Sequence, residues 1–371
     1  MPGKLCPDFA SLNDLMQSFS DTLRQVIEQR DALSREAACA LMHQILSDQD
    51  HALPDTQIAA LLAALAVRGV TAPELAGFVD AMRSVSVRLP LAETERMVLV
   101  DTCGTGGDAS GTFNISTGAA LIAAAAGVKI AKHGNRSVTS CCGSADVLEA
   151  LGVPVNLSPD RAVDCLRQTG FVFLFAPLMN PAMRRVQPLR RALGFRTAFN
   201  VLGPLTNPAG ATRQVMGVYA PELVPLVAET MLLLGMEHGL VVHGASSSSF
   251  ANAGGIDELS LSGPSLLAEV RNGHVSQRTV AAEESGLPSA PLDALAGGDA
   301  QQNAALLRRV FTGETGPYRN ILVWNAAAAL VVAGVASTLR EGITQAAAAI
   351  DSSNAKRTLA ALVEFGRDAA E

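Results

Sequence analysis

The chain has 371 residues, of which 49% are hydrophobic and 17% are charged, and its formal net charge at pH 7 is −7. This length exceeds the roughly 250 to 300 residues at which a single hydrophobic core stops growing, so two domains are expected. The acidic balance argues against a surface built to neutralise the phosphates of a nucleic acid.

The first part of the chain shows helical periodicity and no strand signal. Apolar residues recur at three- and four-residue steps, for example at Leu15, Phe19 and Leu23. Thr71 precedes Glu74 by three residues, which is the pattern of a capping box at the start of a helix. We therefore predict a small all-helical N-terminal domain over residues 1–95, which also receives helices from about residues 177–210.

From Met97 onward, short apolar runs alternate with helical patterns, which is typical of strand–helix–strand units. Strands are expected at Met97–Val100, Val128–Ala131, Phe171–Phe175, Val215–Tyr219 and Leu240–Val242. Helices are expected at Thr117–Ala126, Ala145–Leu151, Pro159–Gln168 and Glu222–Leu234. This alternation predicts a large α/β domain over residues 96–371 with a central, mostly parallel sheet.

The cellular location is predicted from the lack of a membrane span, a signal peptide and a regular cysteine spacing. The longest apolar runs, Gly118–Val128 and Ala326–Val335, fall short of the ~20 residues of a membrane span. The N-terminus carries an early acid and no apolar segment of the kind found in signal peptides. The six cysteines form no Cys-x-x-Cys pair and no regular zinc-site or disulfide-framework spacing. We therefore expect a cytoplasmic protein with reduced thiols and no membrane partner.

A glycine-rich segment, Gly104–Asp108, follows the first predicted strand and precedes Asn114–Thr117 at the start of a helix. Glycines let the backbone approach an anion closely, and a helix N-terminus adds about half a unit of positive charge. The segment therefore suits a phosphate group. The alternative interpretation is a tight strand-to-helix turn with a polar cap, because such turns are common in α/β folds.

Polar residues also follow the second predicted strand. The segment Lys132–Arg136 projects from the carboxyl end of that strand, the edge at which α/β proteins bind ligands. A lysine, an asparagine and an arginine around a glycine suit a polyanion and a hydrogen-bonded acceptor. Ser144 opens the next helix and adds another N-terminus for an anion. The alternative is a solvated polar loop.

Five arginines lie in the stretch from residue 184 to residue 196, namely Arg184, Arg185, Arg190, Arg191 and Arg196. Arginines on helices are mostly solvated or paired with surface acids. A guanidinium is nevertheless the natural bidentate partner of a carboxylate, so one of them is a candidate for holding an acidic substrate.

The pair Asp257-Glu258 follows two glycines after the last predicted strand. Carboxylate oxygens are hard ligands of the kind that Mg²⁺ prefers, and Mg²⁺ often bridges one or two carboxylates to substrate phosphates. An acid pair on a loop is otherwise ordinary solvent-exposed charge.

Taken in this order and spacing, the segments resemble the anthranilate phosphoribosyltransferase family from the first helices to near the end of the chain. The resemblance rests on Gly104–Asp108 with Asn114–Thr117, Lys132–Arg136, Gly143–Glu149, Arg196-Thr197 with Phe199–Leu205, Asp257-Glu258 and Asn325–Ala328. It implies a nucleoside phosphorylase-like fold and a homodimer formed through the helical domain. It also implies magnesium-dependent transfer of phosphoribosyl from 5-phosphoribosyl 1-pyrophosphate to the amine of anthranilate, in tryptophan biosynthesis.

The resemblance also implies roles for single residues. Those expected to hold phosphoribosyl pyrophosphate are Gly104, Gly107, Asp108, Thr112, Asn114, Ser116, Thr117, Lys132 and Ser144. Those expected around anthranilate are Gly104, His133, Asn135, Arg190, Gly203 and Pro204. Two magnesium ions would be ligated by Ser116, Asp257 and Glu258, and the catalytic residues would be Lys132, Asn135 and Arg190. No general base is expected, because the aniline nitrogen is already neutral at pH 7.

The chain departs from the family pattern at several positions. Ala109 stands where glycine is common, and a left-handed conformation there would cost roughly 1–2 kcal/mol. Cys141-Cys142 replaces the usual Lys-Ser and removes a positive charge near the phosphates. Asn180 stands where histidine is common, and Ala245–Ala253 is a serine-rich insertion that makes the placement of the acid pair less certain.

Two other functions fit part of the pattern. A pyrimidine nucleoside phosphorylase shares the fold and a similar lysine loop, but the acid pair and the stretch Arg190–Pro204 favour transfer from the pyrophosphate donor. A non-catalytic paralogue that binds nucleic acid would need a basic surface, which a net charge of −7 disfavours.

Overall fold

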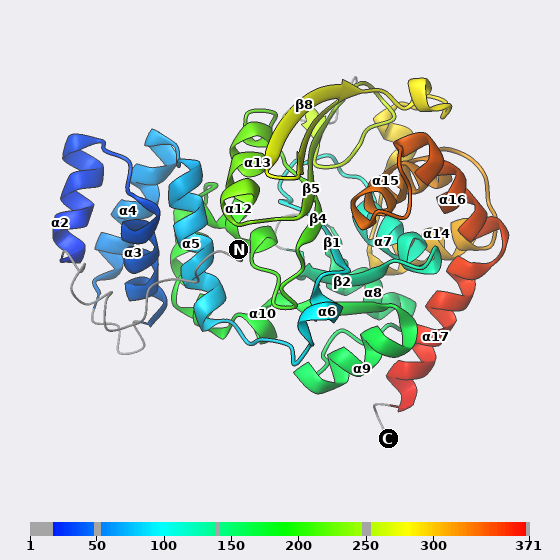
Figure 1. Ribbon diagram of the computed structural model, residues 1–371, viewed down its shortest axis with the longest axis horizontal. Helices are drawn as coiled ribbons and strands as arrows, with labels where there is room; N and C mark the ends of the chain where they lie inside the picture. Colours follow the sequence, from blue (N-terminus) through cyan, green and yellow to red (C-terminus); the bar gives the residue numbers. More distant parts are fainter. Residues whose placement is uncertain (1–17, 48–52, 138–140, 247–253, 369–371) are drawn as a thin grey trace.

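The computed structural model describes residues 18–47, 53–137, 141–246 and 254–368. Figure 1 shows a helical bundle at one end, a twisted sheet in the middle, and further helices around the C-terminal end of the chain. The bundle consists of α2 (Phe19–Arg24), the π-helical turn η1 (Gln25–Gln29), α3 (Arg35–Ser47), α4 (Asp55–Arg68) and α5 (Ala72–Val85). Between residues 18 and 98, the described part of the chain contains no strand, as the periodicity predicts.

The capping box at the start of α5 is confirmed. The Thr71 hydroxyl accepts the backbone N–H of Glu74, and Glu74 Oε2 accepts the backbone N–H of Thr71 at 2.9 Å. Glu74 is fully buried, and its other carboxylate oxygen accepts the backbone N–H of Leu33 at 3.0 Å. The cap therefore also fixes the loop that precedes α3.

A second group of helices from the middle of the chain packs on this bundle. It comprises α10 (Ala176–Met179), η2 (Pro181–Arg185), α11 (Gln187–Leu193), α12 (Phe199–Leu202) and η3 (Gly203–Leu205). Val186 and Leu202 are buried in the same core as the bundle. Arg185 Nη1 donates to Asp55 Oδ1 at 2.7 Å, and its Nη2 donates to the carbonyl of Leu53 at 2.9 Å. These helices thus share a core with the bundle, while the domain division at residue 95 and the assignment of residues 177–210 to the helical domain stay predictions.

The part of the chain that the structure describes contains eight strands in one mostly parallel sheet, which confirms the predicted fold class. They are β1 (Leu99–Gly104), β2 (Lys129–Gly134), β3 (Phe171–Phe175), β4 (Arg213–Gly217), β5 (His238–Ala245), β6 (Gly255–Ile256), β7 (Ser265–Arg271) and β8 (His274–Val280). The order is β3-β2-β1-β4-β5-β7-β8, with β6 paired to β5. β1 to β5 pair with one another in parallel, whereas β6 and β7 pair with β5, and β8 pairs with β7, in antiparallel fashion.

Three predicted strands end too early, one of them Leu240–Val242, because β5 continues to Ala245. The predicted strand Val215–Tyr219 ends too late, because β4 ends at Gly217. β1 continues past Val100 to Gly104, and β2 continues past Ala131 to Gly134. The polar residues that suggested an end have partners inside the sheet, since the Lys132 ammonium donates to the carbonyl of Thr102. The antiparallel strands β7 and β8 were missed because β8 is largely exposed and mostly polar.

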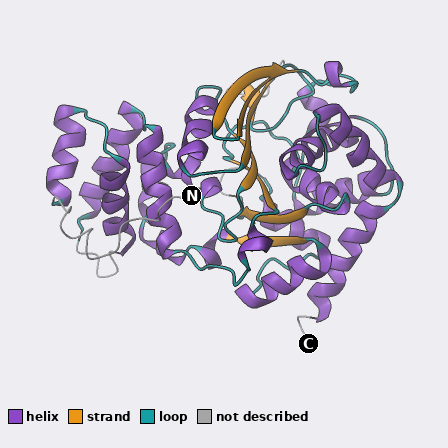
Figure 2. Ribbon diagram, viewed as in Figure 1, coloured by secondary structure: helices purple, strands orange, loops and turns teal. Residues whose placement is uncertain are grey.

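Alternating side chains along the strands give the sheet two apolar faces. On β4 and β5, Val215 and Val242 belong to one core, whereas Met216 and Val241 belong to the core that includes the bundle. The helix α13 (Leu223–Leu233) covers the second face, and Figure 2 shows helices on both sides of the strands. The other helices are α6 (Glu93–Arg96), α7 (Ile115–Ala125), α8 (Ser144–Leu151), α9 (Pro159–Thr169), η4 (Glu283–Ser285), η5 (Leu292–Leu295), α14 (Ala300–Phe311), α15 (Pro317–Ala333), α16 (Leu339–Asp351) and α17 (Asn354–Asp368).

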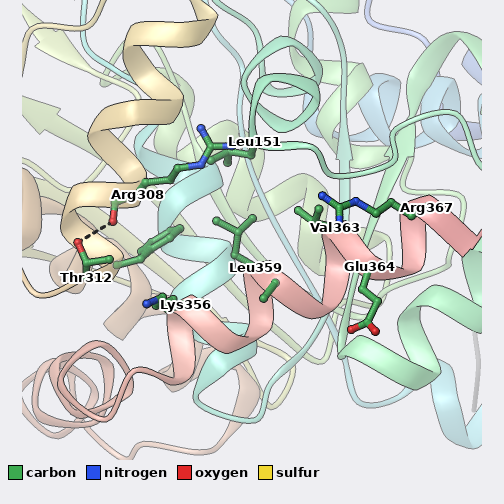
Figure 3. Close-up of a pocket in the computed structure, with 10 residues that line it drawn as sticks. Leu151, Arg308, Thr312, Lys356, Leu359, Val363, Glu364 and Arg367 are labelled. Atoms are coloured by element: carbon green, nitrogen blue, oxygen red, sulfur yellow. Dashed lines mark hydrogen bonds between the residues drawn. The ribbon is translucent and has the colours of Figure 1, made fainter.

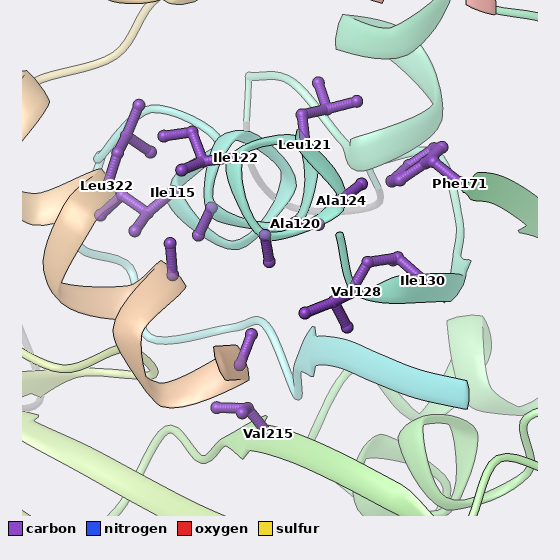
Figure 4. Packing of buried hydrophobic residues seen from close by; sticks show 14 of the residues in the cluster. Ile115, Ala120, Leu121, Ile122, Ala124, Val128, Ile130, Phe171, Val215 and Leu322 are labelled. Atoms are coloured by element: carbon purple, nitrogen blue, oxygen red, sulfur yellow. The ribbon is translucent and has the colours of Figure 1, made fainter. Parts of the chain in front are cut away.

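The first face is covered by α7 and α15, two helices rich in small residues. Figure 4 shows Ile122 and Ile115 of α7 facing Leu322 of α15. A Cβ at Gly118 would lie 2.6 Å from Leu307 Cδ2, so glycine permits this close packing. A helix that is apolar on all sides must be buried on all sides, as α15 is around Trp324. The packing holds the N-terminus of α7 firmly against the end of β1.

Within the described residues, no helix is long and apolar enough to cross a membrane. The free thiols there are Cys103, Cys141, Cys142 and Cys165.

Candidate active site

The glycine-rich segment after β1 adopts conformations that favour glycine. Gly106, Gly107 and Gly111 have φ angles of 65°, 76° and 69°, in the left-handed region. Ala109 has a φ of 56°, so the family departure at this position falls where a methyl group is unfavourable. The segment leads to Asn114, which precedes the first residue of α7. The predicted phosphate-binding turn thus lies at a strand end and a helix N-terminus.

The acid pair lies directly beside this turn. The Gly106 N–H donates to Asp257 Oδ2 at 2.7 Å, and the Ser116 N–H donates to Glu258 Oε1 at 2.9 Å. Gly104 and Gly217 are register partners on β1 and β4, and a Cβ on either would overlap Asp257, at 2.2 Å and 1.5 Å from its nearest atoms. Glycine at both positions therefore lets the acid pair approach the sheet.

The electrostatics of the acid pair fit a divalent cation. Burial, together with the charges of Asp108 and Glu258, raises the pKa of Asp257 well above its usual value. Burial raises the pKa of Glu258 to about 7, although Lys132 and the Ser116 N–H oppose the shift. Clustered carboxylates with too little positive charge are stabilised by a bound cation. The described residues contain no group of three or more His, Cys, Asp and Glu arranged as a complete metal site, so a cation bound here would need further ligands, such as the Ser116 hydroxyl, water or substrate.

Lys132 supplies positive charge across from the acid pair Asp257-Glu258. Its side chain is only 2% exposed, and its ammonium donates to Ser116 Oγ at 3.3 Å as well as to the carbonyl of Thr102. Burial lowers its pKa, while Asp101, Glu258 and Asp257 act to raise it. The ammonium is therefore held between the helix start and the acid pair.

Other residues predicted to hold the phosphoribosyl donor lie around the same turn, whereas Thr117 lies within the packing face of α7. Asn114 Nδ2 donates to the carbonyl of Cys142 at 3.1 Å, so the vicinal cysteines lie beside the turn, as the sequence departure implied. Asp108 Oδ1 accepts the N–H of Ser110 at 3.2 Å, and the Ser110 hydroxyl lies 3.0 Å from that of Thr112. Thr117 is buried on α7 and contributes to its packing face.

His133 marks the acceptor side of the site at the end of β2. Its backbone N–H donates to Asp101 Oδ1 at 3.1 Å, and the backbone of Gly203 lies near its ring. Its Nε2 also lies 3.4 Å from Asn180 Nδ2. Burial lowers the pKa of His133 to about 4, so the ring is neutral at pH 7. The structure thus brings two predicted anthranilate residues, His133 and Gly203, into contact.

Arg190 and Asn135 each have a local partner. The Arg190 guanidinium lies over the Phe199 ring, 5.4 Å from its centroid, and burial lowers the pKa of Arg190. Asn135 Oδ1 accepts the N–H of Arg136 at 2.7 Å, and the Asn135 carbonyl accepts the Ser144 hydroxyl at 3.1 Å. No hydrogen bond among the described residues joins Arg190 to Asn135.

The sequence reasoning missed a buried polar network behind the site. Asp101 accepts Gln214 Nε2 at 3.4 Å, and Gln214 also donates to the carbonyl of Pro204 at 2.7 Å. Burial raises the pKa of Asp101 to about 6, although Asn207, Lys132 and the backbone N–H of His133 act to lower it. The available signal was a single acid inside an otherwise apolar strand, since buried charges are rare without a partner.

Arg196 was predicted only as part of a family motif, and the structure gives it a contact with the donor turn. Its Nη2 donates to the carbonyl of Gly107, and its guanidinium lies 4.1 Å from the centroid of the Tyr219 ring. The Tyr219 N–H donates to Thr105 Oγ1 at 3.0 Å. Arginine and tyrosine therefore support the turn from its exposed side.

A separate cavity of about 560 Å³ lies between α8, α14 and α17. Figure 3 shows Leu151, Arg308, Leu359, Lys356 and Arg367 around it. None of its lining residues belongs to the predicted site. The candidate active site is therefore defined by the contacts at the sheet edge and not by this cavity.

Comparison with known proteins identifies the family. Residues 96–356 match the family model described as the α/β domain of a glycosyl transferase family, and residues 20–86 match its helical bundle domain. The anthranilate phosphoribosyltransferase of Pelotomaculum thermopropionicum is 50% identical over 333 residues, which cover 90% of this chain and 92% of that protein. The chain belongs to the anthranilate phosphoribosyltransferase family.

Solved structures of this family have the same fold. The anthranilate phosphoribosyltransferase of Thermus thermophilus superposes with a TM-score of 0.84 at 41% identity, covering 94% of this chain and 99% of that one. The enzyme of Saccharomyces cerevisiae in complex with phosphoribosyl pyrophosphate and Mg gives a TM-score of 0.81 at 26% identity, covering 97% and 99% of the two chains.

Proposed function

We propose that this chain transfers the phosphoribosyl group of 5-phosphoribosyl 1-pyrophosphate to the amine of anthranilate, in tryptophan biosynthesis. The products are N-(5-phosphoribosyl)anthranilate and pyrophosphate. The observation that carries the proposal is the approach of Asp257 and Glu258 to the glycine-rich turn and the N-terminus of α7, opposite buried Lys132. The yeast relatives were solved with phosphoribosyl pyrophosphate and Mg, and with 4-fluoroanthranilate, which supports the two substrates.

The donor is expected to lie along the turn and the two helix starts. Gly104, Gly107 and Asp108 would approach one phosphate group through the backbone of the turn. Thr112, Asn114, Ser116 and Thr117 belong to the segment that begins α7, and Ser144 begins α8. Helix N-termini favour phosphate because their first N–H groups lack partners within the helix.

Magnesium fits the donor half of this site. Ser116, Asp257 and Glu258 would hold two Mg²⁺ ions, which would neutralise charge on the departing pyrophosphate. The raised pKa values of Asp257 and Glu258 support this assignment, because they indicate that positive charge is lacking there.

The residues of the chain stabilise the leaving group more than they activate the nucleophile. As the bond from C1 to pyrophosphate breaks, positive charge develops on the ribose and negative charge on the leaving oxygens. Lys132 is held by Ser116 and Thr102, and its ammonium would face those oxygens in the proposed complex. The aniline nitrogen carries its lone pair at pH 7, so the site needs only to orient it.

Anthranilate is expected on the acceptor side, with its carboxylate toward Arg190 and Asn135. His133, Gly203 and Pro204 would form the wall beside it, and Gly104 would lie where donor and acceptor meet. A neutral His133 suits this wall because it carries no positive charge that would compete with Arg190 for the carboxylate of anthranilate. Lys132, Asn135 and Arg190 are thus the proposed catalytic residues.

A homodimer formed through the helical bundle and a cytoplasmic location complete the proposal. Both follow from the family resemblance and the sequence features described above.

The direct test is loss of anthranilate fluorescence in the presence of phosphoribosyl pyrophosphate and Mg²⁺. Signal loss that requires all three components is expected. An absence of signal loss at any Mg²⁺ concentration would contradict the proposal. Phosphorolysis of thymidine or uridine would instead indicate a nucleoside phosphorylase, and retardation of DNA in a gel would indicate the nucleic-acid-binding alternative.

A further inference from the structure

The C-terminal end of α5 contacts both ends of the segment Asn180–Leu205, which contains the residues proposed to bind the acceptor. Arg83 Nη2 donates to the carbonyl of Leu205 at 2.8 Å, and the Ser86 hydroxyl, just after α5, bonds Asn180 Oδ1. Asn180 and Leu205 bound the stretch that contains Arg190, Gly203 and Pro204. The bundle therefore holds this stretch at two points, Asn180 and Leu205. Asn180 in turn contacts His133.

Asn180 is placed to join three elements. Its side chain is only 6% exposed and lies between Ser86 of the bundle and the imidazole of His133 at the end of β2. An amide carries donors and an acceptor on one short side chain, so it can bond a hydroxyl and an imidazole at the same time. A buried polar group without such partners would cost about 1–3 kcal/mol.

The position of the His133 ring depends on its partners. The backbone of His133 is fixed by Asp101, and its ring nitrogen Nε2 lies 3.4 Å from Asn180 Nδ2. A neutral imidazole has one donor nitrogen and one acceptor nitrogen, and Asn180 is placed to donate to the acceptor. Loss of Asn180 would remove this hydrogen bond and free the ring to rotate away from the acceptor wall.

We propose that Asn180 is a positioning residue for the acceptor. It acts through its hydrogen bonds to His133 and Ser86. These bonds fix the position of the acceptor wall, His133 and Gly203, relative to the helical bundle. The inference rests on the proposed function, which assigns this wall to anthranilate. It also gives a role to the position at which the chain departs from its family, where histidine is common.

The test compares Asn180→Ala and Ser86→Ala with Ser84→Ala as a matched control. Ser84 lies in the last turn of α5 and donates to the carbonyl of Ala81 at 2.7 Å, and the Ser86 hydroxyl likewise lies 2.7 Å from the carbonyl of Met82, but Ser84 bonds neither Asn180 nor His133. Asn180→Ala and Ser86→Ala should each raise the Michaelis constant for anthranilate about three- to tenfold, the effect of one hydrogen bond. The constant for phosphoribosyl pyrophosphate should stay unchanged, and Ser84→Ala should behave as wild type.

Two further variants separate positioning from a general loss of structure. The double variant Asn180→Ala/Ser86→Ala should be no worse than Asn180→Ala, because both substitutions break the same chain of contacts. Asn180→His should restore most of the affinity for anthranilate, since imidazole also offers one donor and one acceptor. If Asn180→Ala does not fold, the comparison of Ser86→Ala with Ser84→Ala decides.

Equal changes in both Michaelis constants, additive effects in the double variant, or no difference between Ser86→Ala and Ser84→Ala would overturn the inference. These outcomes require a wild-type protein that consumes anthranilate. A wild-type protein that does not would instead refute the proposed function, so the two failures are distinguishable.

Discussion

The two halves of the site are built in different ways. The donor half consists of strand ends, a glycine-rich turn and helix starts, and Asp257 and Glu258 are fixed there by backbone N–H groups. The acceptor half is assembled from side chains of three regions, in which His133, Asn180 and Ser86 meet. On the proposed function, backbone defines where the pyrophosphate donor binds, whereas side-chain contacts between the sheet and the bundle define where anthranilate binds.

This difference indicates which half tolerates change. Backbone contacts depend on few side chains, so the donor half should be sensitive mainly at its charged residues and at its glycines. Side-chain contacts between elements can be altered one at a time, so the acceptor half should lose affinity in steps.

The acid pair offers the largest expected effect. Asp257→Ala/Glu258→Ala should lower kcat by more than about 1,000-fold, because metal stabilisation of a leaving group contributes several kcal/mol. The variant should remain folded and be at least as stable as wild type in thermal unfolding, because the substitution removes buried like charges. Glu283→Ala/Glu284→Ala changes an exposed acid pair and serves as the control. Unchanged turnover would place the metal site elsewhere.

Arg190 tests the acceptor half. Arg190→Ala should raise the Michaelis constant for anthranilate by a loss of about 1.5–3 kcal/mol, typical of a charge-assisted hydrogen bond, and leave that for the donor nearly unchanged. Arg190→Lys should rescue only in part, since an ammonium lacks the planar fork of a guanidinium. Steady-state kinetics with Arg191→Ala as the control decide. Similar behaviour of both alanine variants would mean that Arg190 is not part of the acceptor site.

Asp101 lies between the halves, because it bonds the backbone of His133 and interacts electrostatically with Lys132. Its pKa is raised from 3.8 to about 6 in the folded protein, so its contribution to stability is full below pH 4 and is lost as the pH rises through 6. Asp101→Asn should remove this dependence, a change of about 2–3 kcal/mol between pH 4 and pH 7. Urea unfolding at several pH values measures it, and parallel profiles for variant and wild type would contradict the assignment.

Ala109 gives the smallest expected effect. Its left-handed conformation favours glycine, so Ala109→Gly should stabilise the protein by about 0.5–1 kcal/mol after the entropic cost of glycine in the unfolded chain. Ser353→Gly, at a φ of 63° and remote in sequence from the site motifs, is a matched control that should gain similar stability. Only Ala109→Gly should change the Michaelis constant for phosphoribosyl pyrophosphate. Equal kinetics for both variants would mean that the turn is already shaped correctly with alanine.

The sequence predicted the parts of the structure that depend on local patterns. The helical bundle, the five parallel strands and the cap at Thr71 follow from periodicity and capping, which act within a few residues. The glycine-rich turn was predicted for the same reason. The actual strand ends were not, because the polar residues of β1 and β2 are satisfied by partners on neighbouring strands.

Contacts distant in sequence were beyond such reasoning. Gly106 meets Asp257 across 151 positions, and His133 meets Asn180 across 47. The family resemblance grouped the first pair through its motifs, but it gave Asn180 no role. Asp101 has no predicted role either, because a polar residue after an apolar run indicates the end of a strand and not a buried network.

The position of Asp257 has a consequence for the evolution of chain length in this protein. β6 is paired to β5, and the backbone of Asp257 lies against Gly217 so closely that no other residue type fits there. The contacts that place the acid pair therefore lie on the C-terminal side of the segment Ala245–Ala253, most of which lies outside the described residues. We therefore expect a change of length between β5 and β6 to leave the two carboxylates in place.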